Sequence, residues 1–380
     1  MSILFIDSFA HYAGTSEAQF ARKWTAYQTG TTKVETSSPR RTNSSYLRLL
    51  PNAAANNWGW LDGDFAAQQT VCVGMAICFT TTLADHKGIR LRDGAGFACS
   101  VYVNADGSVR VYRGYDVIGT QLGSDSATGV ISLNTWHYLE FKVYIHDSAG
   151  TYEVRIDGVN VLSGSGADTK NSTNATADGI TLHGRASGAA GDVDYTDFYI
   201  ATDFLGDSRV DTLWPSGAGN YSEWTPSAGS NYQNVDDAHE IDDDTTYNGT
   251  AVLNEIDSFE YDSLAALVAG HTIDAVAVNL CAKGNIGTQE IQSLIRIATT
   301  DYVGTAIVYP NASYDVGQTI WETNPAGGNW LESAINGAEF GYKMVTDEHI
   351  PYVTQAVVEV LRDNANPAAS SNSVIVAVMA

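Results

Sequence analysis

The chain has 380 residues, more than a single hydrophobic core usually serves, and it suits two domains. It carries 20 Lys and Arg against 44 Asp and Glu, a formal net charge of −24, so nucleic acid is excluded as an expected partner because its phosphates would be repelled. With 35 Gly, abundant Thr, Val, Tyr and Ser, and no long 3.6-residue apolar period, the sequence predicts an all-β protein.

Neither end of the chain predicts targeting or membrane insertion. The opening MSILFIDSFAHYAG has no basic region and no apolar region of secretory length, so no signal peptide is expected. The closing VIVAVMA has seven apolar residues, far fewer than the ~20 of a membrane-spanning helix, and suits a closing strand or one donated to a neighbouring subunit. The cysteines predict small buried packing groups and no cofactor or zinc site: Cys72, Cys78, Cys99 and Cys281.

The first half gives the clearest strand pattern. In WHYLEFKVYIHDSAGTYEVRIDGVNVL, apolar Leu139, Phe141 and Val143 alternate with polar neighbours, which predicts a strand with one core face and one wet face. The turns DSAG and Asp157-Gly158 then predict three antiparallel strands. GIRLRD, FACSVYV and VRVYRGY predict further strands, as do DGITLHG and DVDYTDFYIATD, the latter around a register break.

These patterns predict three regions. Residues 1–203 form a β-sandwich, and residues 204–262 form a Gly- and Asp-rich connector anchored by Trp214 and Trp224. Residues 263–380 form a second, smaller β-domain whose last strand serves assembly.

Four aromatic residues near turns are candidates for glycan binding: Trp58, Trp60, Tyr112 and Tyr115. Sugar rings present apolar faces that stack on flat side chains, while nearby amides and carboxylates bond the hydroxyls. The alternative is that each aromatic residue pins its loop onto the core.

Two acidic stretches are candidates for chemistry. EIDSFE has Glu255, Asp257 and Glu260 at the E-x-D-x-x-E spacing and resembles the catalytic strand of family-16 glycoside hydrolases, but it lies outside the first sandwich, in the expected connector. The run VDDAHEIDDDTTYNG could supply oxygen ligands to Ca²⁺ from Asp236, Asp242 and Asp244, although it lacks the order of a calcium loop and equally suits a solvated acidic loop.

Seven phrases, in chain order, resemble a group of tailed-bacteriophage structural proteins with a concanavalin or laminin-G-like N-terminal domain. They are LFIDSFAHY, RKWT, WHYLEFKVYI…YEVRIDGVNVL, DVDYTDFYIATD, GDSRVDTLWPSGAGNYSEWTPS, DDDTTYNG and YVTQAVVEVLR. The resemblance implies a concanavalin-like, jelly-roll fold for the β-sandwich of residues 1–203. It also implies a virion protein without an established catalytic residue set, assembled in the host cytoplasm with copies of itself and other virion proteins.

The first hypothesis is therefore a non-enzymatic virion protein, either a tail or fibre-like appendage or a decoration of the capsid exterior, which could contact host surface polysaccharide. The second is a carbohydrate-binding module without a virion role. The third is a glycoside hydrolase that uses Glu255, Asp257 and Glu260.

Overall fold

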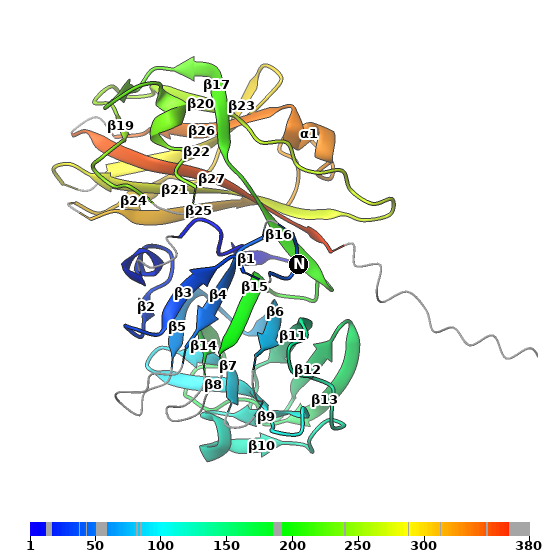
Figure 1. Cartoon of the computed structure of the whole chain (residues 1–380). Coiled ribbons are helices and arrows are strands. Elements are labelled where there is room, and N and C mark those ends of the chain that lie inside the picture. Colours follow the sequence, from blue (N-terminus) through cyan, green and yellow to red (C-terminus); the bar gives the residue numbers. More distant parts are fainter. Residues whose placement is uncertain are drawn as a thin grey trace, which may run out of the picture.

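The computed structural model describes residues 1–364 apart from 13–16, 38, 43, 51–58, 81–82, 84–85, 185–191, 239–240, 288, 312 and 347–348. The all-β prediction is confirmed: strands form four antiparallel sheets, arranged as two β-sandwiches that lie one above the other in Figure 1. Short helical segments join them, namely η1 (Glu17–Arg22), η2 (Asp116–Ile118), η3 (Asn231–Asn234) and α1 (Glu332–Asn336). Within the described part of the chain, no helix has both the length and the hydropathy needed to cross a membrane.

The N-terminal sandwich pairs an eight-stranded sheet, which we call the inner N-terminal sheet, with a seven-stranded outer N-terminal sheet. The inner sheet has the order β13 (Val159–Ala167), β12 (Gly150–Ile156), β11 (His137–Tyr144), β6 (Thr70–Phe79), β15 (Val193–Ala201), β4 (Tyr46–Leu49) and β3 (Thr32–Glu35), with β1 (Ile3–Asp7) paired to β15. The outer sheet has the order β10 (Thr120–Leu122), β9 (Val109–Arg113), β8 (Gly96–Val103), β7 (His86–Asp93), β14 (Ala177–His183), β5 (Trp60–Gln68) and β2 (Ala26–Tyr27).

The C-terminal sandwich also has an inner and an outer sheet. The inner one has the order β18 (Thr225–Pro226), β19 (Asn248–Gly249), β27 (Pro351–Asp363), β21 (Ile273–Gly284) and β25 (Asp315–Trp321), with β16 (Ser208–Leu213) paired to β27. The outer one has the order β17 (Pro215–Ser222), β20 (Ile256–Tyr261), β26 (Ala338–Met344), β22 (Gln289–Ile297) and β23 (Thr300–Val303), with β24 (Ile307–Tyr309) paired to β22.

Several predicted local features are present. β11, β12 and β13 form the expected meander, in which Leu139 pairs with Ile156 and Val154 with Leu162. Asp157 and Gly158 both have positive φ, 52° and 77°, as a tight hairpin turn that follows the twist of the strands requires. β15 contains the expected register break, which falls between Thr196 and Tyr199.

The stretch 204–262, expected to be a connector, instead contains β16 to β20 and belongs to the second sandwich. β16 pairs with β27 of the inner C-terminal sheet, and β20 pairs with β26 of the outer C-terminal sheet. The sequence there is rich in Gly, Ser and Asp, and because Gly and Asp are uncommon in strands, this composition does not indicate the strands that form. Trp224 is a core residue, as its expected anchoring role requires, with 2% of its surface exposed.

The two inner sheets pack against each other, so the molecule has four β-layers. Alternate residues of β21 serve two cores: Val276 and Val278 lie inside the C-terminal sandwich, whereas Ala275 and Ala277 face the N-terminal one. This packing corrects the prediction that one face of β11 is wet. Glu140 is fully buried, because the second sandwich covers that face.

Charged side chains are buried in this interface as well. Lys23 Nζ lies 2.9 Å from Glu359 Oε2 and 3.6 Å from Asp7 Oδ2, so one cation of the N-terminal sandwich joins carboxylates of both sandwiches. Glu359 also accepts hydrogen bonds from the Ser8 backbone N–H at 2.7 Å and from Asn279 Nδ2 at 3.0 Å. Because these groups are buried, their mutual pairing offsets the cost of removing them from water.

Candidate functional site

The outer N-terminal sheet carries polar and aromatic side chains on the face that points away from its core. In β5, Trp60 and Asp62 alternate with the fully buried Leu61, as the two-residue period of a strand requires. In β7, Arg90 and Arg92 alternate in the same way with core residues. Both pairs therefore share one face of the sheet.

The register of three strands brings these residues together. Thr181 of β14 pairs with Asp62 on one side and with Arg90 on the other, and His183 pairs with Trp60. They surround a cavity of about 360 Å³. Its aromatic and charged lining consists of Trp60, Phe97, Tyr115, Asp62, Arg90 and Arg92.

Tyr115 is held at this cavity by a buried ion pair. Arg90 Nε donates to Asp116 Oδ1 at 2.9 Å, and Arg90 Nη2 bonds the second oxygen of the same carboxylate. The Arg90 guanidinium carbon lies 4.1 Å from the centre of the Tyr115 ring, and the edge of Phe97 packs on that ring with the ring centres 5.0 Å apart. The Tyr115 ring is therefore fixed before any ligand arrives.

Asp62 and Arg92 form a second polar pair in the cavity. Arg92 Nη1 lies 4.0 Å from Asp62 Oδ2, and Arg92 Nη2 donates to the Gly63 carbonyl at 3.0 Å and also bonds Asp64. Burial raises the pKa of the Asp62 carboxyl above its ordinary value, against the lowering effects of Thr181 and Arg92. Asp62 Oδ1 and Arg92 Nε are buried atoms with no hydrogen-bond partner among the described residues.

The structure brings together two of the four predicted glycan-binding residues. Trp60 and Tyr115 line the same cavity, although 54 positions of sequence separate them. Tyr112 is 4% exposed and packs edge-on against Tyr102, so it supports the sheet rather than the cavity. Trp58 lies outside the described residues.

Sequence reasoning missed the charged half of this site. The alternation in GIRLRD already places Arg90 and Arg92 on one face of a strand whose other face is core. Charges alternating with core residues in the middle of a sheet are a signal that could have been used. Thr181 and His183 in DGITLHG follow the same pattern.

The EIDSFE motif lies on a strand, β20, but its carboxylates are not gathered in one cleft. Asp257 is fully buried and accepts hydrogen bonds from Asn231 and from the backbone of Glu223 and Trp224, while burial raises its pKa to about 6. Glu260 is exposed on the other side of the strand, near Gly217.

Glu255 lines a separate, shallow cavity in the C-terminal sandwich, together with Tyr247 and Tyr352. The two tyrosine rings pack with their centres 4.1 Å apart. The acid and nucleophile of a retaining hydrolase must face one sugar from about 5 to 5.5 Å apart, and Glu255 and Glu260 do not share this cavity.

Of the calcium candidates Asp236, Asp242 and Asp244, the last two bond other protein groups. Asp242 accepts from Thr246 Oγ1 at 2.8 Å and from Thr354 Oγ1 at 3.2 Å, which ties the acidic run to β27. Asp244 pairs with Lys283. Repulsion by Asp242 adds to burial in raising the pKa of Asp236.

Asp7, His11 and Glu359 are the residues that a metal could use most readily, because their ligand atoms lie within 4.8 Å of one another. Among the described residues, no other group of three His, Cys, Asp or Glu meets this condition. The ammonium group of Lys23 already lies between the carboxylates of Asp7 and Glu359 and supplies the positive charge that pairs with them. The expectation of no cofactor stays a prediction.

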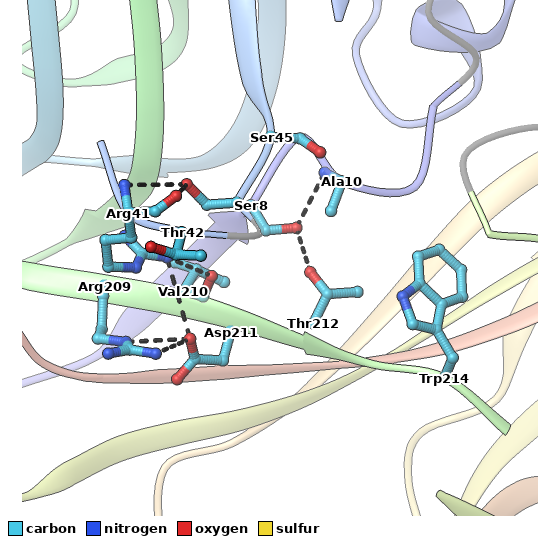
Figure 2. A pocket seen from close by; sticks show the side chains of 11 residues that line it. Ser8, Ala10, Arg41, Thr42, Ser45, Arg209, Val210, Asp211, Thr212 and Trp214 are labelled. Carbon is cyan, nitrogen blue, oxygen red and sulfur yellow. Dashed lines mark hydrogen bonds and ion pairs between the residues drawn. The ribbon is translucent and has the colours of Figure 1, made fainter. Parts of the chain in front are cut away.

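A smaller cavity of about 170 Å³ lies at the joint between the sandwiches (Figure 2). Ser8 and Thr212 bond across it through their hydroxyls at 2.7 Å, and Arg209 pairs with Asp211. Arg41 pairs with the buried Asp197. These charged groups bond one another, and the cavity serves as a polar joint between β1 and β16.

No family model and no curated protein matches the chain. Solved structures resemble it over about half its length. Alginate lyase Aly36B is 13% identical, with 54% of this chain and 97% of the lyase covered and a TM-score of 0.37. A carbohydrate esterase of the Shiga toxin-encoding bacteriophage phi24B is 15% identical, with 53% and 100% covered and a TM-score of 0.37. A Trypanosoma rangeli sialidase is 14% identical, with 47% and 30% covered and a TM-score of 0.30.

These matches correct the expectation of a non-enzymatic protein. Each of the three solved structures is that of an enzyme named for its action on carbohydrate: a lyase, an esterase and a sialidase. At these identities and TM-scores the matches identify neither a family nor a reaction.

Proposed function

We propose that the protein binds carbohydrate in the cavity on the outer N-terminal sheet. The observation that carries the proposal is the meeting of Trp60 and Tyr115 in one cavity that also contains paired Asp and Arg side chains. Flat rings accept the apolar face of a sugar, and fixed carboxylate and guanidinium groups bond its hydroxyls. The Arg90–Asp116 pair holds Tyr115 in place, which lowers the entropic cost of binding.

We further propose that this binding serves a bacteriophage particle, as a tail or fibre-like appendage or as a decoration of the capsid exterior. The seven phrases that resemble tailed-phage structural proteins support this assignment, and the net charge of −24 suits an exterior position better than contact with packaged DNA. Its partners would be copies of itself, other virion proteins and host surface polysaccharide. Antibody labelling of purified particles under the electron microscope tests the location, and absence of the chain from particles would contradict it.

Retention on immobilised polysaccharides tests the binding site. Trp60→Ala and Tyr115→Ala should each weaken retention roughly tenfold or more, because the stacking of the aromatic ring on a sugar face is lost with the side chain. Tyr144→Ala is the matched control, since it removes a half-buried ring from the inner sheet of the same sandwich. Full retention by both cavity variants, or no retention of any polysaccharide by the unaltered protein, would contradict the proposal.

A carbohydrate-cleaving activity in the same cavity is a second candidate. The raised pKa of the Asp62 carboxyl, in a cavity that also contains His183, favours it because a buried carboxyl can exchange protons with a bound ligand. Release of new sugar ends, measured at saturating polysaccharide and abolished by Asp62→Asn, would support cleavage. Unchanged polysaccharide after prolonged incubation would contradict it.

A further inference from the structure

Two rows of residues cross three strands of the outer N-terminal sheet at the carbohydrate cavity, which Asp62, Thr181, Arg90 and Arg92 of these rows line. One row is Asp62, Thr181 and Arg90, and the next is Asp64, Gly179 and Arg92. The second row has no side chain on its middle strand. Arg92 can therefore extend across β14 and reach β5.

Gly179 is the reason that Arg92 takes this path. A Cβ atom at Gly179 would lie 2.8 Å from Nη2, 2.9 Å from the guanidinium carbon and 3.0 Å from Nε of Arg92. The guanidinium thus lies flat over the glycine while Nη2 bonds the Gly63 carbonyl and Asp64. Any larger residue at this position would push the guanidinium aside.

This arrangement leaves one donor and one acceptor without partners, on two side chains that face each other. Arg92 Nε and Asp62 Oδ1 are buried and have no hydrogen-bond partner among the described residues, and the two side chains approach to 4.0 Å. Buried polar atoms are usually satisfied, because an unpaired one costs roughly 1 to 3 kcal/mol. A ligand that offers an acceptor and a donor side by side would satisfy both.

The charges of the cavity argue against an acidic ligand. Arg90 is paired with Asp116, and Arg92 with Asp64 and Asp62, so the two guanidinium groups face one more carboxylate than they can neutralise. An incoming carboxylate or sulfate would find the charge of each guanidinium already neutralised by a carboxylate, and Asp62 would repel it. Sugar hydroxyls carry no charge, and each can both donate and accept.

We infer that the cavity recognises an uncharged sugar through two adjacent hydroxyls, one donating to Asp62 Oδ1 and the other accepting from Arg92 Nε, with Gly179 positioning the guanidinium. The inference rests on the proposed carbohydrate-binding function and names its ligand class. The sugar ring would lie against Trp60 or Tyr115. Its specificity would come from the diol, because a site with fixed polar groups rejects ligands that leave them unpaired.

Chemically modified polysaccharides test this inference directly. The unaltered protein is tested on a panel of neutral and acidic polysaccharides, and the best neutral one is then oxidised with periodate and reduced with borohydride, which destroys adjacent diols. We expect preference for neutral over acidic polysaccharides and loss of retention after periodate. Preference for acidic polysaccharides, or undiminished retention on the oxidised polysaccharide, would overturn the inference. The carbohydrate-binding proposal is judged separately, because it still holds if Trp60→Ala loses retention.

A positioning variant supplies the second readout. Gly179→Ala should weaken binding of the neutral polysaccharide roughly ten- to hundredfold, as expected for losing a hydrogen bond to a charged group. Gly96→Ala in β8, on the far side of β7 in the same sheet, is the control, since its new Cβ would approach nothing closer than the Asp93 carbonyl at 3.5 Å. Folding of both variants is checked by the thermal midpoint, and a folded Gly179→Ala protein with unchanged affinity would overturn the role of the guanidinium.

Discussion

Buried charged residues between the sandwiches are the residue-scale feature with the largest expected effect on stability. Lys23 is 1% exposed at its side chain and faces the fully buried Asp7 and Glu359. Glu359 has a pKa below its ordinary value: burial alone would raise it, but the charge of Lys23, together with hydrogen bonds from Lys23 and the Ser8 backbone N–H, outweighs that effect. The Glu359 carboxylate therefore depends on the Lys23 cation.

Lys23→Met should lower the free energy of unfolding by about 3 to 5 kcal/mol, because it leaves two buried carboxylates without a compensating cation. Lys142→Met is the matched control: Lys142 pairs with Asp203 on the surface, where the pair contributes at most about 1 kcal/mol. Urea unfolding of both variants measures the difference. Equal losses in the two variants would contradict the importance of the buried cation.

His11 predicts a specific dependence of stability on pH. Burial, together with the charge of Lys23, lowers the pKa of His11, against the raising effects of Glu359 and Asp7, so the ring stays neutral in the fold while it protonates near pH 6.5 in the unfolded chain. The contribution of the neutral His11 ring to the free energy of unfolding is present above pH 6.5 and is lost as the pH falls below that value. His11→Leu should reduce the slope of unfolding free energy between pH 6.5 and 5 by up to about 1.4 kcal/mol per pH unit. An identical slope in both proteins would contradict this.

Glycines inside strands are the decisive feature at the scale of elements. Gly341 in β26 lies so close to β20 that a Cβ atom would be 1.9 Å from the carbonyl oxygen of Asp257. The contact is with backbone, which cannot move without separating the two strands. The outer C-terminal sheet therefore requires glycine at this position.

Gly341→Ala should destabilise the C-terminal sandwich by roughly 1 to 3 kcal/mol or more, the usual cost of overpacking a rigid site. Gly96→Ala, at the exposed start of β8, should change stability by less than about 0.5 kcal/mol. Thermal unfolding monitored by near-ultraviolet circular dichroism compares them. A Gly341→Ala protein as stable as the control would show that the strands can separate locally.

How far the sequence predicts the structure depends on which element is considered. The β11 to β13 meander follows from local alternation and one Asp-Gly turn, and it forms as expected. Strands β16 and β20 could not be predicted from local patterns because they pair with distant parts of the chain, as Val210 does with Leu361 and Phe259 with Phe340. Trp60 and Tyr115 were predictable as binding residues, but their shared cavity depends on a strand order that local patterns do not encode.

At the scale of the whole molecule, the contact between the inner sheets joins the sandwiches into one body. Small residues allow the close approach: Cys72 and Ala76 of β6 lie on one side, and Ala275 and Ala277 of β21 on the other. Apolar burial over this contact couples the stability of both sandwiches. The chain should therefore unfold as a unit.

Calorimetry should show one unfolding transition for the unaltered chain and two for Ala277→Glu, which places an unpaired charge in the contact. Ala298→Glu, in the turn after β22, serves as a control for adding a carboxylate elsewhere. Two transitions already in the unaltered protein would contradict the coupling. A single transition in Ala277→Glu would show that the contact tolerates the charge.

Assembly through the C-terminal strand remains a prediction, since residues 365–380 lie outside the described residues. Deleting Val374–Ala380 should reduce self-association or incorporation into particles if that segment adds a strand to a neighbouring subunit. Light scattering of the two proteins at equal concentration measures this. An unchanged molecular mass and unchanged particles would contradict the role.

The order of the four layers gives the molecule two opposite ends. The cavity lies on the outermost layer at one end, while the outer C-terminal sheet forms the other. A particle that grips the C-terminal end would hold the cavity outward at the tip of a rigid spacer, where many copies could engage one polymer chain simultaneously. Weak individual contacts would then add up to firm attachment that a single protein in solution would not display.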